Sequence, residues 1–402
     1  MEKIVQKFGG TTLNEEEKRI QVAKCIKEKK QNHKFPVVVV SAMGRKGDPY
    51  ATDTLIQLAR KKNDDIAPRE KDLIMSCGEI ISSVIIVQEL KNINLKARAL
   101  TGGQAGIITD GNFTKASIEE INPQKIMDYI KSDIIPVIAG FQGKTNEGEI
   151  TTLGRGGSDT TASVVATGVN AEVIEIYTDV KGVMTADPVK VEDAKVLSEI
   201  NYNEVCELAY QGARVLHPRA VEIARNNNIP IKIKSIFNSS KGTIIRNNKK
   251  GIKGDQLVTG VTSRDNIIFI KIIPDKKTKY ATGLKIFNLL AANDISVDFI
   301  NIRPSAISFI IEKDVLNKFK EIMEKEDFNY SLSSNFVKVS AVGGGMTGQP
   351  GVMSKIVETL NENNIAIYQT TDSHTTISCL IKKEKENEAL NLLHKAFSLE
   401  KA

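Results

Sequence analysis

The chain has 402 residues, of which 41% are hydrophobic and 26% are charged, and its formal net charge is +6 at pH 7. This composition is typical of a globular protein, and the length predicts two or three domains rather than one core. With no Trp and 5% aromatic residues, the sequence offers no basic surface with stacking platforms, so we expect no nucleic-acid partner. No apolar run approaches the ~18 residues of a membrane span, and the N-terminus leads straight into a strand without room for a signal peptide. We therefore expect a cytoplasmic protein with no membrane partner.

The four cysteines and four histidines are scattered along the chain. They show neither a Cys-x-x-Cys pair nor a metal-ligand spacing, which predicts buried free thiols and no protein-built metal site. The residues are Cys25, Cys77, Cys206, Cys379, His33, His217, His374 and His394.

From residue 1 to about residue 237, β-branched runs alternate with amphipathic helical patterns. Near-continuous apolar strands suit a sheet that helices cover on both faces. The alternation predicts an α/β fold, an α/β/α sandwich with a mostly parallel sheet, whose ligands bind at the carboxyl ends of the strands. The predicted strands are Ile4–Phe8, Pro36–Ser41, Ile134–Phe141, Glu172–Thr178 and Ile231–Ser235, and the predicted helices include Glu15–Lys30, Asp72–Lys91 and Glu204–Ala209.

A glycine pair, Gly9 and Gly10, follows the first predicted strand, which ends in Lys7 and Phe8. Glycine lets successive amides turn toward one concave point, and Lys7 adds a positive charge beside it. Phosphate is the usual ligand of such a site. Since a Gly-Gly turn after a strand is often only a turn, this interpretation depends on the rest of the chain.

A second glycine cluster, from Gly154 to Asp159, precedes a predicted helix of small residues. It is not a dinucleotide fingerprint, whose third glycine would fall on Asp159. What remains is an anion-binding nest at a helix N-terminus. Arg155 has the planar fork that binds a carboxylate bidentately, and Asp159 is placed to orient either Lys7 or a magnesium ion.

Beyond a polar link, the chain contains an internal repeat with an offset of 70 residues, in which residues 306–311 lie over residues 376–381. One offset that holds across a helix, a loop and two strands indicates a duplicated unit. Each unit reads strand, glycine-led helix, strand, strand, helix and a possible closing strand. We place the first domain at 1–240, the link at 241–262 and the two α+β units (βαββαβ) at 263–333 and 334–402.

In its motifs and their order, the chain resembles the aspartate kinases of the amino-acid kinase family, and the repeats resemble ACT domains, which are small amino-acid-sensing modules. The resemblance implies transfer of the ATP γ-phosphoryl group, with ATP and Mg²⁺ as cofactors, to the side-chain carboxylate of L-aspartate. The product, 4-phospho-L-aspartate, would be the first intermediate toward lysine by way of diaminopimelate, and toward threonine and methionine. The matching stretches are Lys7–Thr11, Ser41–Gly44, Ser76–Glu79, Thr101–Gly106, Gly154–Asp159, Thr178–Pro188 and Gly212–Pro218.

The residue types suit this chemistry, because a carboxylate nucleophile is already ionised at pH 7 and the obstacle is repulsion between anions. The resemblance implies that Lys7 stabilises the transferring charge, that Glu79 binds the substrate ammonium and that Arg155 binds its α-carboxylate. The full implied set is catalytic Lys7 and Asp159; substrate-binding Ser41, Thr52, Glu79, Arg155 and Ser158; and nucleotide-binding Lys7, Gly9, Gly10, Thr178, Asp179, Met184 and Arg214.

The resemblance also implies feedback regulation by an end-product amino acid bound to the ACT-like units. We expect lysine, threonine or diaminopimelate at the turn of the first unit, on Asn293, Ile295, Val297 and Asp298. Exposed sheet edges on such units favour pairing between chains, so we expect a homodimer or homotetramer.

Three positions depart from the family pattern. Lys190 stands near the place of a usual nucleotide-contacting arginine, Arg214 stands where lysine is frequent, and residues 44–51 are longer than in some relatives and resemble a mobile flap of a Gram-positive subgroup. Two alternatives stay open: another amino-acid kinase, acting on glutamate, acetylglutamate or a nucleoside monophosphate, and an inactive amino-acid sensor.

Overall fold

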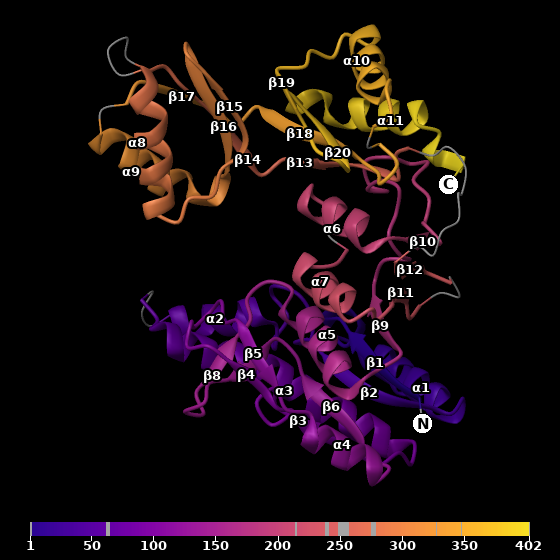
Figure 1. Ribbon diagram of the computed structural model, residues 1–402. Helices are drawn as coiled ribbons and strands as arrows, with labels where there is room; N and C mark the ends of the chain where they lie inside the picture. The colour runs from indigo at the N-terminus through magenta and orange to yellow at the C-terminus, as the bar shows by residue number, and fades with distance from the viewer. Residues whose placement is uncertain are drawn as a thin grey trace. The chain divides into compact units, whose positions relative to one another are not determined.

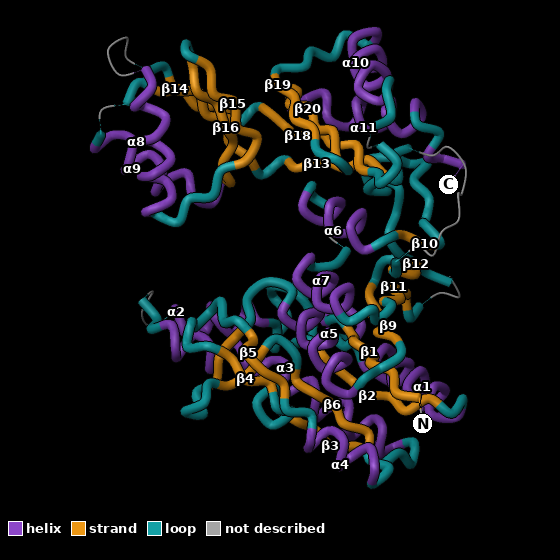
Figure 2. Tube along the Cα trace, in the orientation of Figure 1, coloured by secondary structure: helices purple, strands orange, loops and turns teal. Residues whose placement is uncertain are grey.

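The computed structural model describes residues 2–61, 65–213, 215–237, 241–247, 257–274, 279–326 (backbone only at 279–281), 328–346 and 348–401. Figures 1 and 2 show its helices and strands. The chain divides into two compact units. The N-terminal unit comprises Met1–Val183, Val196–Ala209 and Arg214–Gly251, and the C-terminal unit comprises Met184–Lys195, Tyr210–Ala213 and Ile252–Ala402.

The N-terminal unit is built on an eight-stranded sheet in the order β10-β12-β11-β9-β1-β2-β6-β3. Every neighbouring pair is parallel except β11 and β12, so the predicted mostly parallel sheet is confirmed. The five predicted strands form the contiguous stretch from β11 to β6. The strands are β1 (Glu2–Phe8), β2 (Lys34–Val40), β3 (Ala97–Leu100), β6 (Ile135–Ala139), β9 (Val173–Thr178), β10 (Glu199–Ile200), β11 (Ile231–Ser235) and β12 (Thr243–Ile245).

Two pairs of helices pack on this sheet. Helices α1 (Glu16–Gln31) and α3 (Pro68–Asn92) contact each other, and α5 (Gly157–Val169) contacts α7 (Pro218–Asn226). Since central strands such as β6 are buried along their whole length, the sheet is covered on both faces, as in the predicted sandwich. The other helices of the unit are α2 (Thr52–Arg60), α4 (Gln124–Lys131), α6 (Tyr202–Tyr210) and the short 3-10 helix η1 (Gly10–Thr12).

A second, small sheet in this unit was not predicted from the sequence. It has the order β5-β4-β7-β8, and β8 packs against α3. Its strands are too short to leave a clear periodic pattern. They are β4 (Ile107–Thr109), β5 (Ile118–Ile121), β7 (Gln142–Lys144) and β8 (Ile150–Thr152).

Helix α3 alone, among the described residues, is long and apolar enough to cross a membrane. The sequence analysis predicted this stretch as the helix Asp72–Lys91 but counted no apolar run of membrane length in it, since Glu79 and Glu89 interrupt the run. Half of its apolar window is buried inside the unit, where α3 contacts β3, β6 and β8. This burial is typical of the core helix of a soluble protein.

The C-terminal unit contains two four-stranded antiparallel sheets with the same spatial order of equivalent strands. The first, β15-β16-β14-β17, carries helices α8 and α9, and the second, β19-β20-β18-β13, carries α10 and α11. Strands β16 and β20 begin 70 residues apart, which confirms the predicted duplication. The elements are β13 (Gly260–Arg264), β14 (Ile267–Ile272), α8 (Lys279–Ala292), β15 (Asp298–Arg303), β16 (Ala306–Glu312), α9 (Leu316–Lys325), β17 (Tyr330–Ser333), β18 (Phe336–Val342), α10 (Val352–Glu362), β19 (Gln369–Asp372), β20 (Thr376–Lys382) and α11 (Glu386–Ala396), with 3-10 turns η2 (Lys313–Val315), η3 (Lys383–Lys385) and η4 (Leu399–Lys401).

The linear repeat predicted that the closing strand of the second repeat comes from the end of the chain. The structure shows another origin. The closing strand is β13, which precedes the first repeat and pairs with β18 in antiparallel register. The first repeat is therefore inserted between one edge strand of the second repeat and the rest of it. The segment 241–262, which we expected to be only a link, contains strands of both units. Strand β12 belongs to the main sheet of the N-terminal unit, and β13 belongs to the sheet of the second repeat.

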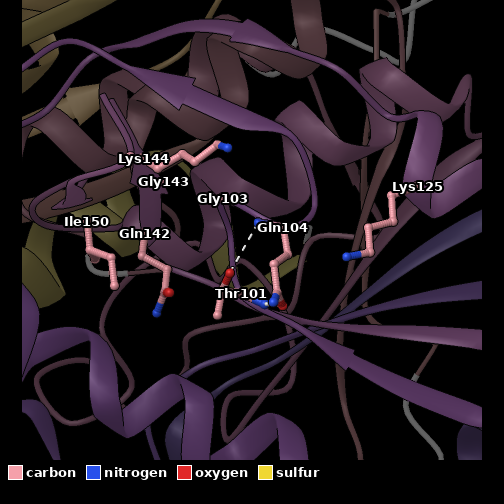
Figure 3. Close-up of a pocket in the computed structure, with 9 residues that line it drawn as sticks. Thr101, Gly103, Gln104, Lys125, Gln142, Gly143, Lys144 and Ile150 are labelled. Atoms are coloured by element: carbon pink, nitrogen blue, oxygen red, sulfur yellow. Dashed lines mark hydrogen bonds between the residues drawn. The ribbon is translucent and has the colours of Figure 1, made fainter. Parts of the chain in front are cut away.

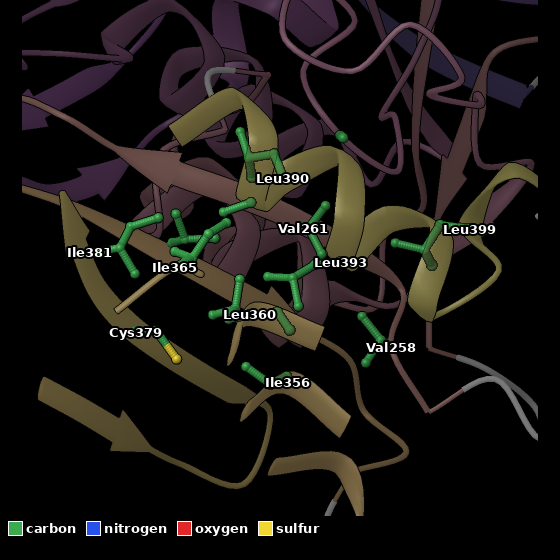
Figure 4. Packing of buried hydrophobic residues seen from close by; sticks show 14 of the residues in the cluster. Val258, Val261, Ile356, Leu360, Ile365, Cys379, Ile381, Leu390, Leu393 and Leu399 are labelled. Atoms are coloured by element: carbon green, nitrogen blue, oxygen red, sulfur yellow. The ribbon is translucent and has the colours of Figure 1, made fainter. Parts of the chain in front are cut away.

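Residues 184–195 also belong to the C-terminal unit, although we expected them in the first domain. Ala186 and Val191 join the core of the second repeat, and Figure 4 shows the packing of this core around Leu360 and Leu393. His394 of α11, which is fully buried, lies 2.9 Å through Nε2 from the Thr185 hydroxyl. This segment is held by side chains more than 190 positions away, so its placement is not readable from local pattern.

All four cysteines are free, and Cys206 and Cys379 are buried as expected, whereas Cys25 and Cys77 are half-buried. Burial raises the pKa of the Cys206 and Cys379 thiols to about 12, so they are inert at neutral pH.

Candidate active site

A cleft of about 610 Å³ opens in the N-terminal unit at the carboxyl ends of β1 and β2 and at the N-terminus of α5. This is the edge at which ligands of parallel sheets bind. The structure brings eight predicted site residues together around it: Lys7, Gly10, Ser41, Thr52, Glu79, Arg155, Ser158 and Asp159.

Lys7 and Asp159 form an ion pair inside this cleft. The Lys7 ammonium lies 2.7 Å from an Asp159 carboxylate oxygen, and the two side chains are 12% and 15% exposed. Lys7 is the next-to-last residue of β1, and Asp159 lies in the first turn of α5. Asp159 therefore fixes the direction of the lysine, which is one of the two roles that the sequence left open.

We had expected the glycine pair to offer two free amides, but the amide of Gly9 is already bonded. The Gly9 amide donates to the Tyr177 carbonyl at 3.1 Å, which continues the pairing of β1 with β9. Gly10 lines the cleft, and a Cβ at this position would lie 2.4 Å from the Ala42 carbonyl oxygen. Only glycine therefore allows the turn to pack against the loop that follows β2.

Glu79 lies on α3 with 3% of its surface exposed. Burial raises the pKa of its carboxyl group to about 8, although hydrogen bonds from the backbone, including that of Ala42, act in the opposite direction. Its Oε2 atom has no hydrogen-bond partner among the described residues. A buried acceptor of this kind is ready to receive a cationic donor from a ligand.

Helix α5 begins at the cleft with the glycine cluster. Gly156, its N-cap, has φ of +70°, and a Cβ there would lie 2.2 Å from the Cβ of His217. Burial lowers the pKa of His217, which favours its neutral form against the helix start. Arg155 is exposed at the rim and Ser158 is buried beside it, so a cation and the helix N-terminus face the same space.

The loop after β2 is fixed to the glycine turn by backbone bonds. The Ser41 amide donates to the Phe8 carbonyl at 3.1 Å, and the Gly44 amide donates to the Gly10 carbonyl at 3.0 Å. Thr52 is the first residue of α2 and also lines the cleft. Ser41 and Thr52 both line the cleft, so their hydroxyl groups are candidate contacts for a ligand.

The predicted nucleotide residues are only partly assembled. Thr178 ends β9, and its hydroxyl donates to Asp179 at 3.1 Å. Asp179 is bound by Arg45, which lines the cleft. Met184 belongs to the C-terminal unit, and Arg214 lies outside the described residues.

Lys190 does not take the place of the family's nucleotide-contacting arginine within the contacts that the structure describes. Its ammonium lies 2.7 Å from a Glu386 carboxylate oxygen and 3.1 Å from the Ser263 hydroxyl, all in the C-terminal unit. The lysine therefore fastens the 184–195 segment to α11.

The sequence analysis gave no individual role to several residues that line the cleft. They are Lys71, Thr114, Lys115 and Phe141, together with Arg45 and Lys46, which it placed only within the flap-like segment 44–51. Thr114 is placed by Asp72, a fully buried residue of α3 whose carboxylate accepts from the Thr114 amide at 2.9 Å and from the Thr152 amide at 2.8 Å. Asp72 closes the charged run Arg69–Asp72 at the start of α3, so nothing in the sequence distinguished it from exposed neighbours, and only its burial and its partners reveal its role.

The predicted effector residues lie at the end of α8 and the start of β15. The amides of Asn293 and Ile295 donate to the Leu290 carbonyl at 3.2 and 2.9 Å, and the Ile295 side chain is buried in the core of its repeat. These two amides are thus not available to a ligand, contrary to our expectation. Val297 is partly buried against the same core.

Asp298 makes contacts that link the two repeats. Its carboxylate lies 2.6 Å from the ammonium of Lys338, which is 3% exposed, and 3.9 Å from the Arg264 guanidinium. Burial opposes its charge, but the bond from Lys338 keeps the pKa of Asp298 below its usual range. Asp298 is therefore an internal counter-ion as well as a candidate ligand.

A second cavity, of about 460 Å³, lies between the loop after β3, the β7–β8 hairpin and the start of α4 (Figure 3). Thr101, Gln104, Lys125 and Lys144 line it, and the Gln104 amide donates to the Thr101 hydroxyl at 3.1 Å. No predicted site residue lies there. The described residues also contain no group of three or more His, Cys, Asp or Glu side chains arranged to hold a metal ion.

Sequence comparisons agree with this architecture. The sequence model of the amino acid kinase family matches residues 2–235, and that of the ACT domain matches residues 331–395. Aspartokinase 1 of Bacillus subtilis (strain 168) is 44% identical over 405 residues, which is 100% of both chains. The aspartokinase of Geobacillus stearothermophilus is 38% identical over 402 residues, covering 98% of this chain and 97% of its own. The chain belongs to the aspartokinases.

Solved structures give the same result. Aspartate kinase of Clostridium acetobutylicum is similar with a TM-score of 0.78 and 26% identity, covering 99% of this chain and 100% of its own. E. coli aspartokinase III in complex with aspartate and ADP has a TM-score of 0.81 at 22% identity, covering 98% and 99%. The predicted family, fold class and phosphotransferase function on the side-chain carboxyl of aspartate are thereby confirmed.

Proposed function

We propose that the cleft binds L-aspartate and MgATP together, with Lys7 and Asp159 acting on the phosphoryl group that is transferred. The observation that carries the proposal is the 2.7 Å ion pair between these residues, formed where β1 and α5 meet in a cleft that also holds Glu79 and Arg155. A lysine held by a carboxylate is preorganised, so it needs no rearrangement when charge develops on the phosphoryl oxygens.

The aspartate side of the cleft follows from complementary charge. Arg155 binds the α-carboxylate through its planar fork, and the buried Glu79 carboxyl binds the ammonium. The hydroxyls of Ser41, Thr52 and Ser158 bind the remaining oxygens. An amino acid with a second carboxylate thus presents that group to the space beside Lys7.

The reaction then needs charge neutralisation and alignment rather than a base. An oxygen of the substrate's side-chain carboxylate forms a bond to the γ-phosphorus, the bond from that phosphorus to the bridging oxygen breaks, and its electron pair leaves with ADP. Gly10, Thr178 and Asp179 form the nucleotide side. The Gly9 amide already donates to Tyr177, so Gly9 contributes to the nucleotide side only by having no side chain there.

Mg²⁺ fits this residue set through the nucleotide rather than through a protein cage. Magnesium usually keeps several waters and takes only one or two carboxylates besides phosphate oxygens. Asp159, which lies beside Lys7, is the carboxylate that would hold the magnesium ion. The ion would neutralise phosphate charge when bound, and Lys7 supplies the fixed positive charge of the protein.

The test is turnover of Lys7→Ala with aspartate, ATP and Mg²⁺. Removing a preorganised charge of this kind typically costs about 10²–10³-fold in rate, and we expect a loss of that size with an unchanged far-UV circular dichroism spectrum. Lys144→Ala, which removes a lysine from the second cavity, is the matched control and should keep its rate. Retention of more than a third of the wild-type kcat by Lys7→Ala would contradict the proposal.

A substrate series separates this function from its alternatives. Trapping the acyl phosphate with hydroxylamine should report product with aspartate and not with glutamate or acetylglutamate, and ADP release should not occur with a nucleoside monophosphate. An absence of ADP release with aspartate would instead favour an inactive sensor.

We further propose that an end-product amino acid regulates the enzyme at Val297 and Asp298 of the first repeat, beside Asn293 and Ile295. The similar E. coli aspartokinase III has been solved in complex with lysine and aspartate, and its likeness to this chain concerns the fold. Strands β15 and β19 form edges of their sheets, which favours a homodimer or homotetramer. We place the enzyme in the cytoplasm.

A further inference from the structure

Arg45 is a cleft residue of the flap-like segment 44–51, and the proposed chemistry gives it no role. It lies in the segment between β2 and α2, lines the cleft together with Lys46, and binds the carboxylate of Asp179 through Nη2. Asp179 directly follows β9. In the sheet, β9 and β2 flank β1 on its two sides, so the pair joins two loops across the carboxyl end of the strand that carries Lys7.

The base of this segment is fixed, whereas the Arg45 side chain is free to change partner. The Arg45 amide donates to the Asp48 carboxylate at 2.7 Å, and the Asp48 amide donates to the Arg45 carbonyl at 2.9 Å. Gly44 has φ of +84°, and its amide donates a hydrogen bond to the Gly10 carbonyl at 3.0 Å. The guanidinium, in contrast, belongs to a side chain that is 74% exposed.

The pair with Asp179 is weak enough to be replaced. Exposed ion pairs contribute little to stability, because water and salt screen them. A nucleotide polyphosphate carries several negative charges and accepts paired hydrogen bonds from a guanidinium fork. A polyphosphate that lies beside Lys7 and Gly10 therefore competes effectively for Arg45.

We propose that Arg45 is a phosphate-binding residue of the kinase reaction, which Asp179 holds across the cleft until the phosphates of the nucleotide take over. It forms no covalent bond and moves no proton; its charge stabilises the phosphoryl oxygens while the bond to the aspartate oxygen forms and the bond to ADP breaks. This proposal rests on the nucleotide side assigned under the proposed function.

The experiment compares nucleotides that differ only in phosphate number. Binding of ADP with Mg²⁺ and of AMP is measured calorimetrically for wild type, Arg45→Ala and Arg45→Lys, together with kcat and KM for ATP and for aspartate. A charge-assisted, forked contact to phosphate is typically worth about 10–100-fold. We expect Arg45→Ala to weaken the binding of ADP by about 10-fold or more and the binding of AMP by less than about twofold. The same variant should have a lower kcat/KM for ATP and a nearly unchanged KM for aspartate. Arg45→Lys should fall between the two, because it keeps the charge and loses the fork.

Arg69→Ala is the matched control, since Arg69 forms an exposed ion pair with Glu149 in the same unit and does not line the cleft. It should behave as wild type in every measurement. Equal losses for ADP and AMP in Arg45→Ala, a change confined to the KM for aspartate, or wild-type values throughout would each overturn the proposal. If Arg45→Ala behaves as wild type while Lys7→Ala is inactive, the role of Arg45 fails and the proposed function stands.

Discussion

Glu79 shows how burial sets the protonation of a single residue. Its carboxyl group has a pKa of about 8 because 3% of its surface reaches water, so at pH 7 the ligand-free protein holds it mostly protonated. The raised pKa means that its neutral form stabilises the fold fully below the ordinary value of 4.5, and that this contribution is lost as the pH rises through 8. Substrate binding must therefore pull the proton off.

We predict that aspartate binding at pH 7 releases close to one proton, because the ammonium of the substrate favours the ionised form of Glu79. The affinity for aspartate should rise between pH 6 and pH 8 and level off above pH 8.5. Calorimetry in buffers of different ionisation enthalpy measures the released proton. Glu79→Gln should bind aspartate weakly and release none from this position; a wild type that releases no proton at pH 7 would exclude the role of Glu79.

At the scale of elements, the site depends on how closely the turn after β1 packs against the loop after β2. The carbonyls of Ala42 and Gly44 would lie 2.4 and 2.8 Å from a Cβ on Gly10. Both contacts are to backbone, which cannot move without displacing Ser41 and the Arg45 segment. The position of the β2–α2 loop is thus decided by one residue of a different element.

We predict that Gly10→Ala lowers kcat/KM at least 10-fold for both substrates, because a displaced loop carries groups from both sides of the cleft, and misplacement by about 1 Å can cost ~10². Steady-state kinetics checks this. Gly111→Ala is the control, since a Cβ at Gly111 meets no atom within 4 Å. Equal kinetics for the two variants would show that the loop adapts.

Over the whole molecule, the chain passes between the two units five times, since its six segments alternate between them. Ala186 and Val191 pack in the core of the second repeat although they lie between segments of the N-terminal unit. A chain cut near residue 250 would leave these residues without their core, so point variants test regulation more cleanly than truncation does. The contacts of Asp298 supply such variants.

Asp298→Asn should weaken feedback inhibition and also lower the free energy of unfolding, because it leaves the buried Lys338 without its counter-ion. Breaking a buried pair typically costs about 3–5 kcal/mol, and we expect the lower end because the Asp298 side chain is 45% exposed. Asp298→Asn/Lys338→Met should regain stability, since an apolar side chain tolerates burial, yet remain poorly inhibited. Denaturant unfolding and half-inhibition by lysine, threonine and diaminopimelate measure the two effects. Wild-type inhibition of the double variant would move the effector site elsewhere.

The sequence by itself determined the features that local pattern encodes. The five central strands of the main sheet, the helix after Gly157 and the 70-residue duplication follow from apolar periodicity and turn chemistry, which act over a few neighbouring residues. Eight predicted site residues also line one cleft. The shared edge of the parallel sheet explains this for the residues that end or follow β1 and β2, whereas Glu79 reaches the cleft from the interior of α3.

Only the tertiary structure decided which partners those residues have. The Gly9 amide donates a hydrogen bond to the Tyr177 carbonyl. Three charged residues form ion pairs: Lys190 with Glu386, Arg45 with Asp179, and Asp298 with Lys338. The edge strand β13 likewise joins the sheet of β18, more than 70 residues later. Each of these contacts joins residues that are distant in sequence, and their energies depend on burial and geometry, neither of which a linear pattern contains.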